Sequence, residues 1–234
     1  MAVYLMVQLP LGPHEGQAYV LGFGFIPAVF FGQAELSGEL AKVPSTATLV
    51  TSMFSHGGLM HLVGNMWFLW LYGDNVEDAM GRIRYLLFYL ICGCVGTLAH
   101  AALDPASRIP LVGASGAISG VIAAYLLIWP RANMRVFYWL FIFIGTINVP
   151  AFVVLGLWIG EQLFALPAAM QAQGGIAIVA HLGGFASGLA LTPILKRRGV
   201  LLFQSPHSTA FAHSRTKTNR RPGRSMPEVR RKRD

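Results

Sequence analysis

Long apolar segments alternate with short polar ones along the chain, and this pattern predicts a protein that crosses a membrane several times. A helix needs about 20 mostly apolar residues to span a bilayer. Five such windows occur, at residues 57–73, 85–103, 111–129, 136–166 and 174–195. The fourth contains Gly145, Asn148 and Pro150, which interrupt a straight helix. For that window we expect an interfacial or re-entrant lead-in and then a span over about residues 150–166.

The N-terminal apolar segment, residues 1–9, stops at Pro10 and is too short to cross a bilayer. We interpret it as the C-terminal half of a first span. The predicted fold is therefore an all-α polytopic membrane protein with six helices, of which the first is incomplete. Residues 10–55 include a short apolar stretch interrupted by Pro27, and we expect them to form an outer interfacial loop.

Composition and charge agree with a membrane protein. The chain is 54% hydrophobic and 12% charged, whereas roughly a quarter of the residues in a soluble domain are charged. The net charge of +8 is unevenly placed, because 12 of the 18 basic residues and only two of the ten acidic ones lie in residues 196–234. We interpret this segment as a basic, disordered tail that contacts anionic lipid. The uneven charge is explained by topology, so no nucleic-acid partner is expected.

The basic residues also predict the orientation, because Lys and Arg are retained on the cytoplasmic side of a membrane. If the tail shares a side with Arg82, Arg84, Arg131 and Arg135, that side holds 16 of the 18 basic residues. The C-terminus is then cytoplasmic and residues 10–56 lie outside. The second, fourth and sixth spans run inward from the outer face.

Few strongly polar side chains lie inside the predicted spans, and such residues are costly unless they have a function. Four fall roughly 6 to 12 Å below the outer boundary at about 1.5 Å per residue: His61, Asn65, Ser115 and His181. A serine, a histidine and nearby donors are what a nucleophile, its base and an oxyanion site require. His100 and Glu161 also lie near outer span ends, so depth alone leaves them as further candidates.

Small residues surround Ser115 and follow His181. The glycines are Gly113, Gly116, Gly120, Gly184 and Gly188. Ser115 is expected at a helix N-terminus, whose free N–H groups favour a negative charge. The small faces of the two helices are expected to pack closely enough for a hydrogen bond between Ser115 and His181. Each glycine motif taken singly is more typical of ordinary helix packing than of a functional site.

Three motifs in order resemble those of the rhomboid intramembrane serine proteases over about residues 23–195. They are His61-Leu-Val-Gly-Asn65, Gly113-Ala-Ser115-Gly116, and Ala180-His181 followed by Gly184 and Gly188. The resemblance implies a rhomboid-like six-helix bundle with its catalytic membrane core in residues 56–195. It also implies roles: Ser115 as nucleophile, His181 as base in preference to His100, and His61 and Asn65 as oxyanion donors.

The implied activity is that of a serine-type endopeptidase that cleaves in or near the transmembrane segments of single-span or other membrane-protein substrates. It would need no cofactor and no metal, since His61 and His181 have no carboxylate or thiolate ligand close to them in the motifs. The compact plan is similar to that of bacterial members and predicts the plasma membrane. Alternatives are a non-catalytic rhomboid-like binder or scaffold, and a proton-relay transporter, for which the chain lacks an inverted repeat.

The chain departs from the family pattern in two further places. Ser119 stands where some members have an aromatic ring that supports the histidine. The loop of residues 10–55 also lacks a Trp-Arg pair that some bacterial members have there. The family pattern therefore does not predict which residue packs against His181.

Overall fold

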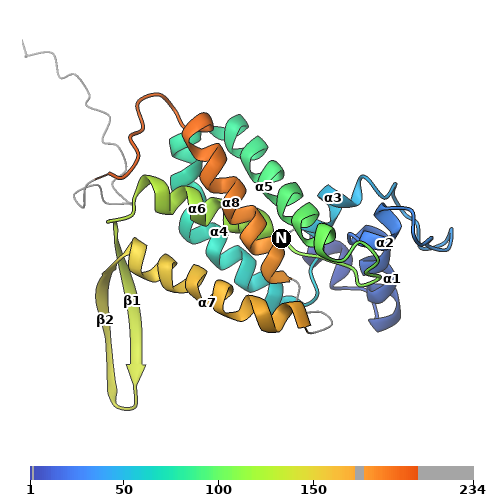
Figure 1. Ribbon diagram of the computed structural model, residues 1–234. Helices are drawn as coiled ribbons and strands as arrows, with labels where there is room; N and C mark the ends of the chain where they lie inside the picture. The colour runs from blue at the N-terminus through green and yellow to red at the C-terminus, as the bar shows by residue number, and fades with distance from the viewer. Residues whose placement is uncertain (2, 172–176, 205–234) are drawn as a thin grey trace, which may run out of the picture.

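The computed structural model describes residues 1, 3–171 and 177–204, which form a helical bundle with one projecting hairpin (Figure 1). The elements are a π-helix η1 (Tyr4–Gln8), α1 (Pro13–Phe23), α2 (Pro27–Phe30), α3 (Thr48–Thr51), a 3-10 helix η2 (Ser52–Phe54), α4 (Leu59–Met80), α5 (Arg82–Leu103), α6 (Ser115–Ile128), β1 (Asn133–Leu140), β2 (Phe143–Pro150), α7 (Ala151–Gln171) and α8 (Ala177–Leu195).

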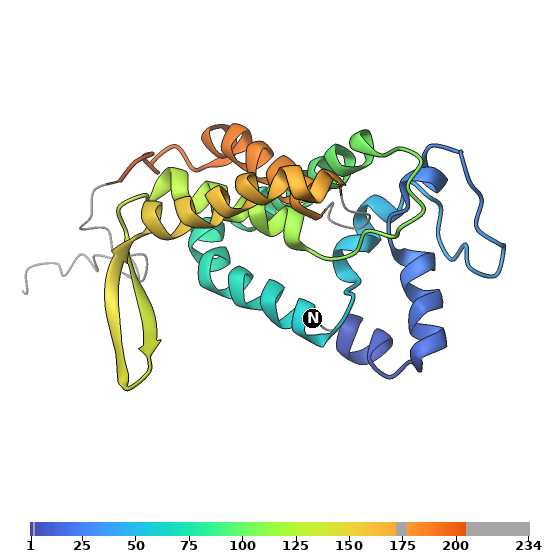
Figure 2. The ribbon, with the colours of Figure 1, turned by 60° about the horizontal axis from the view of Figure 1, so that its bottom comes forward.

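Helix α6 lies at the centre of the bundle, packed against α4, α5 and α8 (Figure 2). Its first half is almost entirely Gly, Ala and Ser, so neighbouring helices approach closely. Its larger side chains, among them Val121, Ile122 and Tyr125, join Phe88 of α5 and Leu155 of α7 in the hydrophobic core. The N-terminus of α6 is therefore held between other helices on several sides.

Three of the described helices are long and apolar enough to cross a membrane: Arg82–Leu103, Ala151–Met170 and Ile178–Leu195. Helix α6 is apolar but shorter, because it begins at Ser115 and residues 111–114, which were predicted to be helical, lie outside it. Helix α4 carries Asp74, Glu77 and Asp78 in its last two turns. The predicted class, a polytopic helical membrane protein, is confirmed.

The segment before α7, where an interfacial or re-entrant lead-in is predicted, is a β-hairpin, a secondary structure that the sequence pattern did not specify. Strands β1 and β2 pair antiparallel from Asn133↔Pro150 to Leu140↔Phe143. Both are rich in β-branched and aromatic residues, which favour strands. The connection is Phe141-Ile142, with Phe141 at φ +54°, and it lacks the Gly, Asn or Asp that usually signals a hairpin turn.

Helices α1 to α3 lie at the end of the bundle opposite the hairpin (Figures 1 and 2). A bridge between Phe25 and Leu111 joins this region to the segment before α6. At the N-terminus, η1 is attached through Gln8, whose Nε2 donates to the carbonyl of His56 at 2.5 Å and whose Oε1 accepts from the His56 N–H at 3.1 Å. That residues 1–9 belong to a first span stays a prediction.

The first part of the basic tail packs against the bundle, which corrects the predicted disorder for residues 196–204. The Arg197 N–H donates to the Ala79 carbonyl at the end of α4. The Trp129 Nε1–H donates to Gln204 Oε1 at 3.1 Å. These backbone and amide partners cap helix ends, an interaction that composition does not encode. Residues 205–234, which carry the rest of the predicted tail, lie outside the described residues.

Candidate active site

Ser115 and His181 lie in hydrogen-bonding contact. Ser115 is the first residue of α6 and His181 lies in the first half of α8. The distance from His181 Nε2 to Ser115 Oγ is 2.8 Å, which is the reach a nucleophile and its base need. Two residues separated by 66 positions are brought together because α6 and α8 pack along their lengths.

The other ring nitrogen of His181 contacts Gln162 of α7, a residue that sequence reasoning missed. His181 Nδ1 lies 2.8 Å from Gln162 Oε1, and Gln162 Nε2 donates to Glu161 Oε2 at 3.0 Å. An ionised carboxylate only accepts hydrogen bonds, so Glu161 fixes which end of the amide faces His181. The amide oxygen then requires a hydrogen on Nδ1, which leaves Nε2 as the acceptor for the Ser115 hydroxyl.

Trp158 lies one helical turn before Gln162 and faces the same imidazole. Its ring centroid is 6.3 Å from that of His181 with the planes tilted by 35°. Ser119, which stands where some family members have an aromatic ring, donates to the Ser115 carbonyl at 2.7 Å. The support for His181 therefore comes from α7 rather than α6. The four-residue spacing of Trp158 and Gln162 on a predicted span is the signal that could have indicated this.

His61 and Asn65 lie one turn apart on α4, beside the entry to α6. Asn65 Nδ2 donates to the His61 carbonyl at 3.0 Å and keeps a second N–H free for another acceptor. The backbone N–H of Gly57 donates to His61 Nδ1 at 3.4 Å. A neutral imidazole in this arrangement carries its hydrogen on Nε2. Both side chains therefore carry donor hydrogens, and both line the same cavity as Ser115.

Gly113 is required in the turn that begins α6. Its φ is +117°, a conformation that other residues rarely adopt. Its N–H donates to the Ser52 carbonyl at 2.9 Å, and a Cβ there would lie 2.6 Å from His61 Cε1. The absence of a side chain thus lets His61 approach the backbone next to Ser115.

The glycine faces of α6 and α8 meet directly. A Cβ on Gly184 would overlap the Gly116 carbonyl, and one on Gly188 would overlap the Gly120 carbonyl. The backbones therefore touch at two successive turns. This close approach sets the separation at which His181 reaches Ser115.

Four predicted site residues line one cavity of about 260 Å³: His61, Asn65, Ser115 and His181. Its other walls include Phe68 and Ile122, so apolar side chains make up much of the lining beside these polar ones. His100 is buried on α5 and Glu161 is exposed on α7, and neither lines this cavity. Within the described parts of the chain, no group of three or more His, Cys, Asp or Glu residues is arranged to hold a metal.

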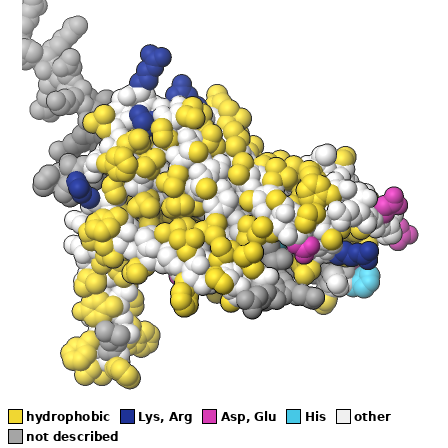
Figure 3. All heavy atoms as spheres, viewed as in Figure 1, with side chains coloured by type: hydrophobic (Ala, Val, Ile, Leu, Met, Phe, Trp, Pro, Cys, Tyr) yellow, Lys and Arg dark blue, Asp and Glu magenta, His cyan; other side chains and the backbone are white. Residues whose placement is uncertain are grey.

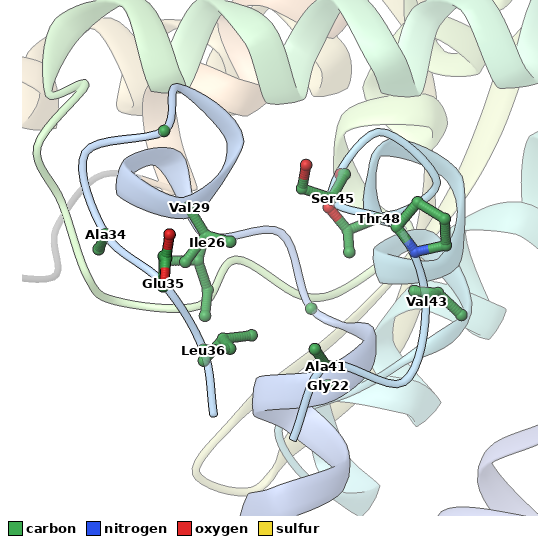
Figure 4. Close-up of a pocket in the computed structure, with 13 residues that line it drawn as sticks. Gly22, Ile26, Val29, Ala34, Glu35, Leu36, Ala41, Val43, Ser45 and Thr48 are labelled. Carbon is green, nitrogen blue, oxygen red and sulfur yellow. The ribbon is translucent and has the colours of Figure 1, made fainter. Parts of the chain in front are cut away.

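A larger hollow of about 430 Å³ lies among residues 22–48, outside the helical bundle (Figure 4). Its walls are mostly glycine and small apolar side chains such as Ile26 and Val43. Glu35, Ser45 and Thr48 are its side chains with functional groups, and Thr48 Oγ1 donates to the Ser45 carbonyl. No nucleophile and base are paired there, so the α4–α6–α8 cavity is the candidate site.

His56 lies immediately outside the site, before the first turn of α4. It is buried, and its ring packs edge-on against Tyr4 at 6.0 Å and His61 at 5.4 Å. Burial, with a smaller contribution from the charge of His61, lowers the pKa of His56 to about 4. At neutral pH this ring is therefore uncharged and leaves no cation beside the donors.

Known proteins resemble this chain over the region that contains the candidate site. Residues 44–198 match the family model of the Rhomboid domain. Rhomboid protease GluP of Bacillus subtilis is 36% identical over 112 residues, which cover 48% of this chain and 20% of that protein. RHOMBOID-like protein 4 of Arabidopsis thaliana is 34% identical over 163 residues, covering 68% of this chain and 34% of that protein.

A third relative is named as an inactive protein. Inactive rhomboid protein 1 of Drosophila melanogaster is 36% identical over 83 residues, covering 35% of this chain and 6% of that protein. The relatives thus include both a named protease and a named inactive protein. The chain spans less than half the length of each of the three.

Proposed function

Since this chain belongs to the rhomboid family, we propose that it is an intramembrane serine endopeptidase with Ser115 as nucleophile and His181 as general base. The observation that carries the proposal is the 2.8 Å contact from His181 Nε2 to Ser115 Oγ, with His181 Nδ1 on Gln162 Oε1. A non-catalytic binder would have no need for a serine hydroxyl held on the basic nitrogen of a fixed tautomer.

In the first step Ser115 Oγ attacks the carbonyl carbon of the scissile peptide bond, and its proton passes to His181 Nε2. The carbonyl oxygen becomes an oxyanion. The Ser115 N–H at the α6 N-terminus, His61 Nε2–H and Asn65 Nδ2–H are the donors for it. Removing one such donor lowers the rate by about 10²- to 10³-fold in a well-studied protease.

In the second step the tetrahedral intermediate collapses, the C–N bond breaks, and His181 gives its proton to the leaving amine. Water then attacks the acyl-enzyme ester with His181 again accepting the proton, and the carboxylic acid and the Ser115 hydroxyl are released. Gln162 keeps a hydrogen on His181 Nδ1 in both the neutral and the protonated ring, which is the orienting task that an aspartate performs in many serine proteases.

The substrates proposed are single-span or other membrane proteins cleaved in or near a transmembrane segment. Backbone carbonyls of an intact helix are already hydrogen-bonded. A substrate must therefore unwind locally before its carbonyl reaches Ser115, which favours segments with helix-breaking or small residues.

The proposed location is a bacterial plasma membrane with the C-terminus in the cytoplasm. The basic residues support this orientation. Of the 18, Lys42 and Arg108 are the two on the predicted outer side of the membrane, and Ser115 is predicted near that side. The relatives include a Bacillus protease and proteins named as mitochondrial. The relatives therefore do not decide between a bacterial and a mitochondrial membrane, and the bacterial plasma membrane is our proposal.

A fluorophosphonate probe and a single-span reporter substrate in proteoliposomes test the function together. We expect the probe to label the wild type, and both labelling and cleavage to vanish in Ser115→Ala. Ser187→Ala is the matched control, because Ser187 lies on α8 outside the cavity lining. Labelling that survives in Ser115→Ala, or a wild type with neither labelling nor cleavage, contradicts the proposal and favours a non-catalytic binder.

A further inference from the structure

The hairpin of β1 and β2 is an exposed apolar surface that the candidate site does not use. It leaves the bundle where α6 ends and α7 begins, and both ribbon views show it running across the helix directions rather than along them (Figures 1 and 2). Its exposed large hydrophobic side chains are Phe137, Trp139, Phe141, Ile142, Phe143, Ile144 and Ile147. At the tip, Phe141 is 95% and Ile142 is 85% exposed.

The strand register divides the hairpin into two unlike faces, since paired residues of an antiparallel ladder point to the same side. One face holds the pairs Met134↔Val149, Val136↔Ile147 and Tyr138↔Gly145, so it is apolar along its length. The other holds Arg135↔Asn148, Phe137↔Thr146 and Trp139↔Ile144. This second face is polar near the bundle and apolar toward the tip.

The apolar face is continuous with the hydrophobic interior of the bundle. Met134, at the root of that face, packs against the core, and the Tyr72 hydroxyl of α4 lies 3.9 Å from its Sδ. In Figure 3, hydrophobic side chains extend from the bundle over much of the visible side of the hairpin. The root of the apolar face is therefore continuous with the packed interior of the bundle.

Two physical limits fix where such a hairpin can lie. The outer edges of a two-stranded ladder leave N–H and C=O groups without partners, which excludes the hydrocarbon core of the membrane. A tip of bare Phe and Ile side chains excludes water. The interface between headgroups and acyl chains satisfies both, and aromatic rings are enriched there. Residues 131–150 contain Arg131 and Arg135 and no acidic residue, a charge that complements lipid phosphates.

We propose that residues 133–150 lie flat in the lipid interface of the leaflet at the α6–α7 end of the bundle. The face of Val136, Tyr138 and Ile147 contacts acyl chains. On the other face, Arg135 and Thr146 point to phosphates and water, and the rings of Phe137 and Trp139 lie at headgroup level. The hairpin thus anchors the start of α7, the helix that brings Gln162 and Trp158 to His181. The inference rests on the membrane class of the fold and is independent of the proposed activity.

Adjacent residues on opposite faces give a matched test. Single cysteines are introduced as Ile147→Cys, Thr146→Cys and Ile142→Cys, with His14→Cys on exposed α1 as the aqueous reference. The parent is full-length Cys94→Ala protein, which keeps the fully buried Cys92. The four variants are spin-labelled in phosphatidylcholine and phosphatidylglycerol nanodiscs, and thermal unfolding confirms that each is folded like the parent.

Collisions of each nitroxide with oxygen and with a water-soluble nickel complex report its depth. We expect the oxygen-to-nickel ratio at Ile147 and Ile142 to exceed that at His14 several-fold, with Thr146 below Ile147. Labels at Ile147 and Ile142 that are as accessible to nickel as His14 place the hairpin in water and overturn the proposal. Spin–spin broadening at Ile142 shows that a second copy covers the tip, and this result also overturns it. Equal ratios at Ile147 and Thr146 overturn the assigned orientation.

Discussion

His181 is held through both ring nitrogens and against one ring face, so its orientation does not depend on a carboxylate in direct contact. Glu161 fixes the Gln162 amide, the amide fixes the hydrogen on Nδ1, and Nε2 is left toward Ser115. A neutral amide stabilises an imidazolium less than a carboxylate does. The arrangement therefore supplies orientation and tautomer rather than charge.

Removing the acceptor at position 162 is expected to lower the rate of the proposed reaction without weakening substrate binding. In Gln162→Met the side chain keeps its length, but the imidazole loses its tautomer partner. We expect kcat to fall by about 10- to 100-fold, with KM unchanged, because the base itself remains and general acid–base catalysis as a whole contributes about 10²- to 10⁴-fold. The measurement is cleavage of a single-span substrate in proteoliposomes.

Two variants make this result specific to the hydrogen bond. Gln162→Glu retains an acceptor and is expected to recover most of the activity. Gln204→Met is the same substitution at the opposite end of the bundle, where Gln204 contacts Trp129, and is expected to leave kcat unchanged. A Gln162→Met protein with normal kcat would show that the Gln162 hydrogen bond does not contribute to the reaction. A Gln162→Met protein that is inactive only because it unfolds would show that Gln162 contributes to folding instead.

His56 makes the stability of the fold depend on pH. The pKa of its ring falls from 6.5 to about 4 on folding because the ring is buried. The folded state therefore favours the neutral form, and this stabilisation is present above pH 6.5 and is lost as the pH falls toward 4. By pH 5 the loss is about 2 kcal/mol.

His56→Phe keeps a ring of similar shape and removes the titration. We expect the wild type to lose about 2 kcal/mol more of its free energy of unfolding between pH 7 and pH 5 than the variant loses. Denaturant unfolding in detergent at the two pH values measures the difference. The same pH dependence in both proteins would show that His56 does not titrate in this range.

At the scale of helices, the α6–α8 contact is the structural basis of the site. Gly184→Ala places a methyl group on the Gly116 carbonyl, so the helices must separate. Overpacking of this kind costs about 1 to 3 kcal/mol, and we expect a lower midpoint of thermal unfolding and weaker probe labelling of Ser115.

The matched control is Gly160→Ala on α7, where a Cβ meets nothing within 4 Å. There the substitution is expected to be neutral or to stabilise the helix by up to about 1 kcal/mol. If Gly184→Ala unfolds at the same temperature as Gly160→Ala, the contact does not set the helix separation.

Helices α4 to α8 were predictable from the sequence because each contains an apolar stretch near the length that a membrane requires, whereas the short helices α1 to α3 lie in residues predicted to form a loop. The hairpin was not, because its turn residues Phe141 and Ile142 give no turn signal and its strands read as another apolar run. The motif residues were found because small and polar residues are rare in spans. Gln162 was missed because a single amide has no motif, and its partner on α8 is known only once the helices are packed.

For the molecule as a whole, the two ends of the bundle differ in chemistry. The start of α6 lies toward the end that holds the helices α1 to α3, and the hairpin and the C-terminal end of α8 lie at the other end (Figure 1). Residues 196–204 pack on the ends of α4 and α6 at this second end. Basic residues are therefore concentrated where the chain leaves the bundle.

Truncation after Gln204 separates the orienting role of the bundle from that of the distal tail. It removes nine of the 18 basic residues. Of the nine that remain, seven still lie at the hairpin end, and they are Arg82, Arg84, Arg131, Arg135, Lys196, Arg197 and Arg198. Because charges close to the spans set topology, we expect the truncated protein to insert in the same orientation.

Reporter fusions measure this outcome. A fluorescent protein fused after Gln204 is expected to fluoresce in the cytoplasm, and alkaline phosphatase fused at the same point is expected to be inactive. Charge-neutral replacement of Arg82, Arg84, Arg131 and Arg135 in the truncated chain leaves Lys196, Arg197 and Arg198 against Lys42 and Arg108, and this near balance is expected to give mixed orientations. If truncation alone inverts the protein, residues 205–234 set the topology, because the loops between the helices then hold too little charge to do so.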